Sequence, residues 1–173
     1  QLRELGLPVL VVLNKYDVLK RRNQSIDTNK LSEKLGCPVV ALSAYNRQEV
    51  LSFKAILPAL IEQTQATQAL ELTYGEEIDA LVNQLASQLN HPHLSARGCA
   101  LRLLEQDPVV EESMAGQIAG SAMQQVAHLQ KAQDLDLTLA DARFSYVYNE
   151  CRPTLRQHGK LSQKRSEQLD NLL

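Results

Sequence analysis

The sequence lacks tryptophan, has few aromatic residues of any kind (4%) and contains only three cysteines in 173 residues. Cys37, Cys99 and Cys151 are far apart and odd in number, which excludes a disulfide scaffold and favours a reducing compartment. No charge of either sign dominates, since the net charge is −2, so a broad nucleic-acid-binding face is not expected. The apolar run Pro8–Leu13 is far shorter than the roughly 20 residues of a membrane span.

Residues 1–66 alternate between strand and helix patterns. Leu7–Leu13 and Cys37–Leu42 are apolar on both faces, as are strands buried within a parallel sheet. Between them, the polar stretch 20–29 leads into a short helix that ends at Gly36. Strand, helix and strand in this order predict a parallel α/β unit.

A longer helix is predicted from about 47 to 65, where Pro58 should kink or divide it. Its predicted apolar face comprises Val50, Phe53, Ile56, Leu57, Leu60 and Ile61. Two strands make a marginal sheet, so we expect segments outside this sequence, or a second copy in a homo-oligomer, to cover the open edge of Val9–Leu13.

The second part of the chain is predicted to be entirely helical. The polar stretch 64–73 marks a boundary, which predicts an α/β domain at 1–66 and a helical domain at 67–173. Ser95 and the pair Asp107-Pro108 are typical first residues of helices. Apolar residues at helical spacing predict a core helix through Ile78, Leu81, Val82, Leu85 and Leu89, with further helices near 116–133, 138–152 and 162–173.

The tetrapeptide Asn14-Lys15-Tyr16-Asp17 follows the first predicted strand and suits the recognition of guanine. The Asp17 carboxylate can accept hydrogen bonds from the ring N1–H and the 2-amino group of guanine, whereas adenine would leave it buried and unpaired. Asn14 can read the opposite edge of the base and join neighbouring loops, and the Lys15 stem can lie along the base plane. A plain Asx turn at a strand end is the alternative.

A second polar loop strengthens the guanine interpretation. Ser43 and Ala44 follow the next strand, Ser43 lying 29 residues after Asn14. Both loops leave the same edge of a parallel sheet, where open α/β folds bind ligands. The small Ala44 lets a backbone N–H approach the guanine oxygen, and Tyr45 comes next.

The order Asn-Lys-x-Asp, helix, Ser-Ala-x resembles the fourth and fifth motifs of small GTPase domains. Its flanks, Leu31–Ala44, and the helical segments Arg102–Asp107 and Leu139–Val147 resemble the bacterial ferrous iron transport protein B (FeoB) family over the entire chain. The resemblance implies the last two strands of a P-loop GTPase-type sheet, followed by a helical guanine-nucleotide dissociation inhibitor domain. Tyr45 departs from the pattern, because many GTPases have lysine there, which puts base stacking in doubt.

The resemblance implies a guanine nucleotide, GTP or GDP, bound through Asn14, Lys15, Asp17 and the loop 43–45, together with Mg²⁺ in the intact protein. Neither a Gly-x-x-x-x-Gly-Lys-Ser/Thr loop nor an Asp-x-x-Gly motif occurs in the sequence. We therefore predict no catalytic residue and no metal ligand here. The phosphate, magnesium and switch residues are expected upstream, and the intact protein is expected to be the GTPase.

Five basic residues and no acidic residue occupy positions 152–165, which suggests a segment next to the cytoplasmic side of a membrane or a solvated helix face. The resemblance implies a membrane region of the same polypeptide, location at the bacterial inner membrane and a role in ferrous iron uptake. Two alternatives stay open: a soluble GTPase with a helical appendage that acts on ribosomes or RNA, and a helical interaction module. The basic residues are Arg152, Arg156, Lys160, Lys164 and Arg165.

His91, His93 and Cys99 lie close together in the sequence and carry side chains that commonly bind metal ions, so they could ligate a metal. A polar loop between helices, carrying two histidines, is the simpler interpretation.

Overall fold

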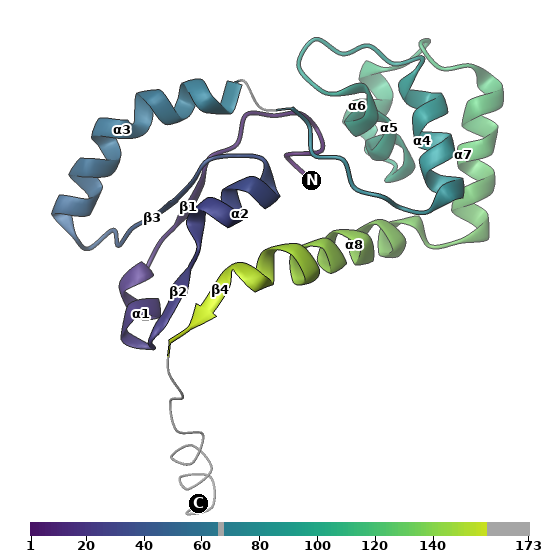
Figure 1. Ribbon diagram of the computed structural model, residues 1–173. Coiled ribbons are helices and arrows are strands. Elements are labelled where there is room, and N and C mark those ends of the chain that lie inside the picture. Colours follow the sequence, from purple (N-terminus) through teal and green to yellow (C-terminus); the bar gives the residue numbers. More distant parts are fainter. Residues whose placement is uncertain (66–67, 159–173) are drawn as a thin grey trace, which may run out of the picture.

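The computed structural model describes residues 1–65 and 68–158. An α/β part and a cluster of helices lie on opposite sides, and the long helix α8 runs from one to the other (Figure 1). The α/β part contains β1 (Val11–Leu13), α1 (Tyr16–Arg21), β2 (Gln24–Ile26), α2 (Thr28–Leu35), β3 (Val39–Ala41) and α3 (Arg47–Gln65). The helical part contains α4 (Glu76–Ala86), α5 (Ala96–Leu104), α6 (Pro108–Ser113), α7 (Gly120–Ala132) and α8 (Leu135–Tyr146), continued by the π-helical turn η1 (Val147–Cys151), the 3₁₀ turn η2 (Arg152–Thr154) and β4 (Leu155–Gln157).

The two predicted strands form the predicted parallel pair, with Val11 opposite Val39 and Leu13 opposite Ala41. They are shorter than the apolar runs that predicted them. The expectation that the first strand is buried on both faces is wrong for this chain, because Val12 is 39% exposed and its neighbours are only half-buried. Among the described residues, β1 has β3 as its one sheet partner, and α3 does not lie against the pair (Figure 1). Part of β1 is therefore left exposed to solvent.

Helix α3 spans the predicted range. It continues through Pro58 as one helix, so of the two effects predicted for this proline, division of the helix does not occur. Its predicted apolar face is not buried, since Ile56 and Ile61 are about half exposed (48% and 47%). Proline removes only one backbone donor, so a helix can pass through it when flanking turns hold.

A second two-stranded sheet was not predicted. β2 lies within the polar stretch 20–29 and pairs antiparallel with β4, which follows the last described helical turn. The prediction of no strand after the boundary is therefore wrong at Leu155–Gln157. The β2–β4 ribbon joins the end of the helical part to the α/β part, as Figure 1 shows.

The main core lies within the helical part, as the spacing of apolar residues predicted. Val82 and Leu85 of α4, Leu104 of α5 and Leu139 of α8 are all at most 1% exposed. The predicted helix caps form: Gly36 ends α2 in the left-handed conformation. Ser95 caps α5, and Asp107 caps α6 with Pro108 in its first turn.

A buried polar cluster ties the first residues of the chain to the helical part. Glu4 accepts hydrogen bonds from the Tyr74 hydroxyl and, at 2.8 Å, from Nε of Arg143. The Arg143 guanidinium also pairs with Glu105, just after α5, and lies 5.8 Å from the centre of the Tyr74 ring. The first residues thus pack onto the helical part, while the predicted domain division at 66/67 stays a prediction.

The last helix expected, near 162–173, lies outside the described residues, as do Lys160, Lys164 and Arg165 of the basic run. Of that run's described members, Arg152 stacks 4.6 Å from the centre of the Tyr148 ring and Arg156 pairs with Asp27 at 2.7 Å. Among residues 1–65 and 68–158, no helix has the length and apolarity needed to cross a bilayer.

Candidate functional site

The loops after β1 and β3 meet at the carboxyl edge of the parallel pair, as predicted. Oδ1 of Asn14 accepts hydrogen bonds from the backbone N–H of Lys15 at 2.7 Å and of Ala44 at 3.0 Å. The backbone N–H of Tyr16 donates to the carbonyl of Leu42 at 3.3 Å. Asn14 therefore joins the two loops, which is the structural part of the role predicted for it.

Asp17 is the charged centre of the site. The Ser43 hydroxyl donates to its carboxylate and accepts from its backbone N–H at 3.2 Å. Arg21, one turn later in α1, donates to the other carboxylate oxygen at 2.8 Å. The hydrogen bond from Ser43, together with the charge of Arg21, holds the pKa of the Asp17 carboxyl below its usual value. Asp17 is therefore an ionised, acceptor-only group at neutral pH.

The residues of the two loops differ in their exposure to solvent. The side chain of Asp17 is 48% exposed. Ser43 is buried, whereas Asn14, Lys15 and Ala44 are exposed and Tyr45 is 95% exposed. A mismatched base such as adenine would leave the Asp17 carboxylate without a hydrogen-bond partner and without water only when the bound base shields it from solvent. Selectivity for guanine therefore depends on how far the bound base buries Asp17.

The backbone of the first loop is unusual at one position. Lys15 adopts the left-handed conformation, with φ 58°, immediately before α1. Non-glycine residues rarely adopt it, and when they do the position is often a functional loop. Here it turns the chain so that Asn14 and Asp17 both face the Ser43–Ala44 loop.

Sequence reasoning missed Glu49, which fixes the second loop. Its carboxylate accepts from the backbone N–H of Ser43 at 2.6 Å and from the Asn46 side chain at 3.0 Å. The Asn46 side chain in turn accepts from the backbone N–H groups of Gln48 and Glu49, at 3.0 and 3.4 Å. Asn46-x-x-Glu49 has the spacing of a capping box, which could have identified the pair. The Arg21–Asp17 pair could likewise have been found from its i, i+4 spacing.

His91 and His93 lie in the loop between α4 and α5. Nδ1 of His91 accepts from the backbone N–H groups of His93 and Leu94, at 3.1 and 3.0 Å, so it caps a turn. Cys99 is fully buried in the helical core. Across the described ranges, no three His, Cys, Asp or Glu side chains are placed to share a metal ion.

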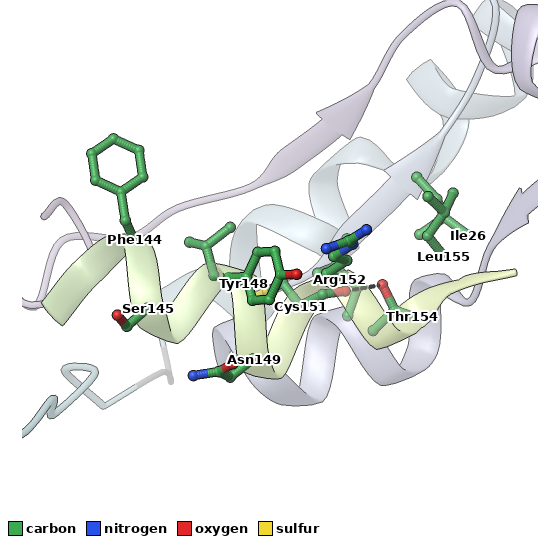
Figure 2. A pocket seen from close by; sticks show the side chains of 11 residues that line it. Ile26, Phe144, Ser145, Tyr148, Asn149, Cys151, Arg152, Thr154 and Leu155 are labelled. Atoms are coloured by element: carbon green, nitrogen blue, oxygen red, sulfur yellow. Dashed lines mark hydrogen bonds between the residues drawn. The ribbon is translucent and has the colours of Figure 1, made fainter. Parts of the chain in front are cut away.

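An apolar groove of about 640 Å³ lies along α8, η1 and the β2–β4 ribbon (Figure 2). None of the predicted site residues lines it. Its lining includes Phe144 of α8 and Tyr148 of η1. It also includes Ile26 and Leu155, which lie opposite each other in the β2–β4 ribbon. The two loops thus form an open surface site at the sheet edge, apart from this groove.

Comparisons with known proteins agree over both parts of the chain. Residues 1–57 match the family model described as ferrous iron transport protein B, and residues 74–156 match that of the FeoB cytosolic helical domain. The Fe(2+) transporter FeoB of Legionella pneumophila strain Paris is 30% identical over the whole chain. The chain spans 22% of that relative's length.

Solved structures show the same arrangement. A mutant of S. thermophilus NFeoB bound to GDP has a TM-score of 0.71 at 26% identity, covering 90% of this chain and 61% of that one. NFeoB from S. thermophilus bound to GDP, AlF4⁻ and K⁺ has a TM-score of 0.68 at 25% identity, covering 87% of this chain and 61% of that one. With both family models matched in order along the sequence, the chain belongs to the FeoB family.

Proposed function

We propose that this chain reads the guanine base of GTP or GDP within a ferrous iron transporter, and that its helical part regulates iron uptake according to the bound nucleotide. The observation that carries the proposal is the joined pair of loops, in which Asn14 holds Ala44 and Ser43 holds Asp17. Family membership and the GDP named in the related structures support it. The match to the helical domain favours this function over an RNA-acting GTPase.

The residues present fit a guanine base. The ionised Asp17 has two oxygens with acceptor capacity left beside Ser43 and Arg21, which suits the adjacent N1–H and 2-amino donors. The Ala44 N–H donates to Asn14 in this structure. With guanine bound, it would donate to the guanine oxygen, either in place of Asn14 or in addition to it. Tyr45 and Lys15 are exposed beside these groups and are the side chains that would cover the base.

Hydrolysis of GTP belongs to the proposal for the whole protein. The sequence holds no phosphate-loop pattern, so the groups that bind the triphosphate and Mg²⁺ would come from outside it. The membrane region of the same polypeptide, at the bacterial inner membrane, would be the partner that receives the nucleotide state. A homo-oligomer stays a further expectation.

The substitution Asp17→Asn in the full-length protein tests whether Asp17 reads the guanine base. Replacing the carboxylate removes two charge-assisted acceptors, so affinity for GTP should fall by about a hundredfold. Affinity for XTP should rise, because its 2-oxo group meets the new amide donor. Asp136→Asn, an exposed aspartate of α8, is the matched control and should leave both affinities unchanged. An undiminished preference of Asp17→Asn for GTP would refute the assignment.

A further inference from the structure

The third residue of the guanine tetrapeptide makes a contact that base recognition does not require. The Tyr16 hydroxyl donates to the carbonyl of Ile26 at 3.2 Å and accepts from the N–H of the same residue at 3.1 Å. One side chain thus satisfies both backbone groups of Ile26, as a neighbouring strand would. Tyr16 itself lies directly before Asp17 and is anchored to the second loop through Leu42.

The other edge of β2 is occupied by β4. Hydrogen bonds run from the N–H of Asp27 to the carbonyl of Thr154 at 2.9 Å and from the N–H of His158 to the carbonyl of Asn23 at 2.7 Å. Ile26 lies opposite Leu155 between these bonds. In an antiparallel ladder the backbone groups of such an intermediate pair point away from the partner strand, and those of Ile26 therefore point toward Tyr16.

Side chains reinforce the ribbon at both ends. Arg156 pairs with Asp27 at 2.7 Å, and the Ser25 hydroxyl lies 2.6 Å from Nε2 of His158. β4 directly follows α8, η1 and η2 in the sequence, so the helix that leaves the helical part leads into this ribbon (Figures 1 and 2). The path from the helical part to Asp17 is thus β4, β2, the Tyr16 hydroxyl and one peptide bond.

We propose that Tyr16 is a positioning residue that couples guanine binding to the docking of residues 154–158 on β2. This inference rests on the proposed function and gives its regulation a physical route. When β4 pairs with β2, Ile26 is held and presents both backbone groups to the Tyr16 hydroxyl, which fixes the start of α1 and the Asp17 carboxylate. Pulling β4 away frees β2 and loosens Asp17, which weakens guanine binding. By reciprocity, a bound guanine nucleotide holds β4 in place.

The first experiment needs no nucleotide and uses hydrogen exchange on this chain. Arg156 lies at the centre of β4, opposite Ser25 of β2, and Arg156→Pro removes its backbone N–H from the ladder. Tyr16→Phe removes only the Tyr16 hydroxyl. Both should speed exchange of the Asp17 and Ala44 amides and leave the core amides of α5 protected. Arg156→Ala loses the pair with Asp27 but keeps the backbone donor, so it should speed exchange less than Arg156→Pro does. Unchanged exchange at Asp17 in both variants would overturn the coupling.

The second experiment measures GDP affinity in the polypeptide as its gene encodes it. Arg156→Pro and Tyr16→Phe should each weaken GDP binding by about fivefold or more, a typical size for coupling between sites. The double variant should be no weaker than the worse single one, because both changes break the same path. Losses that multiply in the double variant, or a full affinity in Arg156→Pro, would overturn the proposal. If the wild type fails to prefer guanine nucleotides, the proposed function fails, and the exchange experiment still decides the coupling.

Discussion

Arg143→Met tests how the first residues of the chain are held to the helical part. Arg143 pairs with Glu4 and Glu105, and the side chains of these three residues are 15%, 3% and 12% exposed. Methionine keeps the length of the side chain but leaves two carboxylates buried without their shared cation. Breaking a buried pair costs about 3–5 kcal/mol. Tyr74 still donates to Glu4 and Arg102 still pairs with Glu105, so we expect a loss near the lower end, about 3 kcal/mol.

Urea unfolding followed by circular dichroism measures this loss. Arg102→Met is the matched control, because it removes a 3.1 Å pair with the same Glu105 but leaves Arg143 in place. Glu105 keeps Arg143 as its partner in this variant, so the loss should be about 1 kcal/mol. Adding Glu4→Gln to Arg143→Met should recover part of the loss, because one unpaired charge disappears. A cost below about 1 kcal/mol for Arg143→Met would refute the account of this cluster.

The same cluster predicts a dependence of stability on pH. Burial raises the pKa of the Glu4 carboxyl, but the Tyr74 hydroxyl and the Arg143 guanidinium lower it, and the pKa lies below its ordinary value of 4.5. A lowered folded pKa contributes stability above the unfolded pKa and loses it as pH falls through the folded value. The free energy of unfolding should therefore drop below about pH 4.5, and Glu4→Gln should flatten that drop.

Two further predictions follow from the site and from the contact between the two parts. Ser43→Ala should raise the pKa of Asp17 toward its usual value, because the lost hydroxyl is the main cause of the lowering; an NMR titration of the carboxyl carbon would show it, and an unmoved pKa would contradict it. Gly98→Ala should destabilise by about 2 kcal/mol, because a Cβ there would lie 2.7 Å from the backbone of Glu4. Gly120→Ala, where a Cβ meets nothing within 4 Å, should be neutral or stabilising in the same urea assay, and equal costs at both glycines would contradict the packing argument.

Local signals in the sequence predicted the local structure well. The caps at Ser95, Asp107 and Gly36 depend on one or two neighbouring residues, which the sequence displays directly. The burial of Leu85 and its helical neighbours followed from spacing alone, since a helix that packs on others buries one face.

The two loops of the site could also be placed from the sequence. Parallel strands end at the same edge, so Asn14 and Ser43 had to lie close together once the strands were recognised. Which atoms would pair was not predictable in the same way. The use of the Ala44 N–H by Asn14, and of Glu49 by Ser43, depends on side-chain positions that the pattern does not encode.

The β2–β4 ribbon could not be predicted for a different reason. Each strand has three residues, too few to show alternation, and β2 is polar in two of them. Its partner lies more than a hundred residues away, with Gln24 opposite Gln157, so no local signal announces the pairing. The prediction that β1 and α3 are buried was wrong for a similar reason. An apolar run indicates that a surface must pack against something, but it does not show that the packing partner lies within the same sequence.

The most direct test of the central claim is an NMR titration of this chain with GMP and, separately, with AMP. Few phosphate contacts are available to it, so binding should be weak and visible only at millimolar nucleotide. We predict that GMP shifts the amide signals of residues 14–17 and 43–45, that AMP does not, and that Asp17→Asn abolishes the GMP shifts. Equal shifts with both nucleotides, or shifts confined to the apolar groove beside Tyr148, would contradict the claim that these loops read guanine.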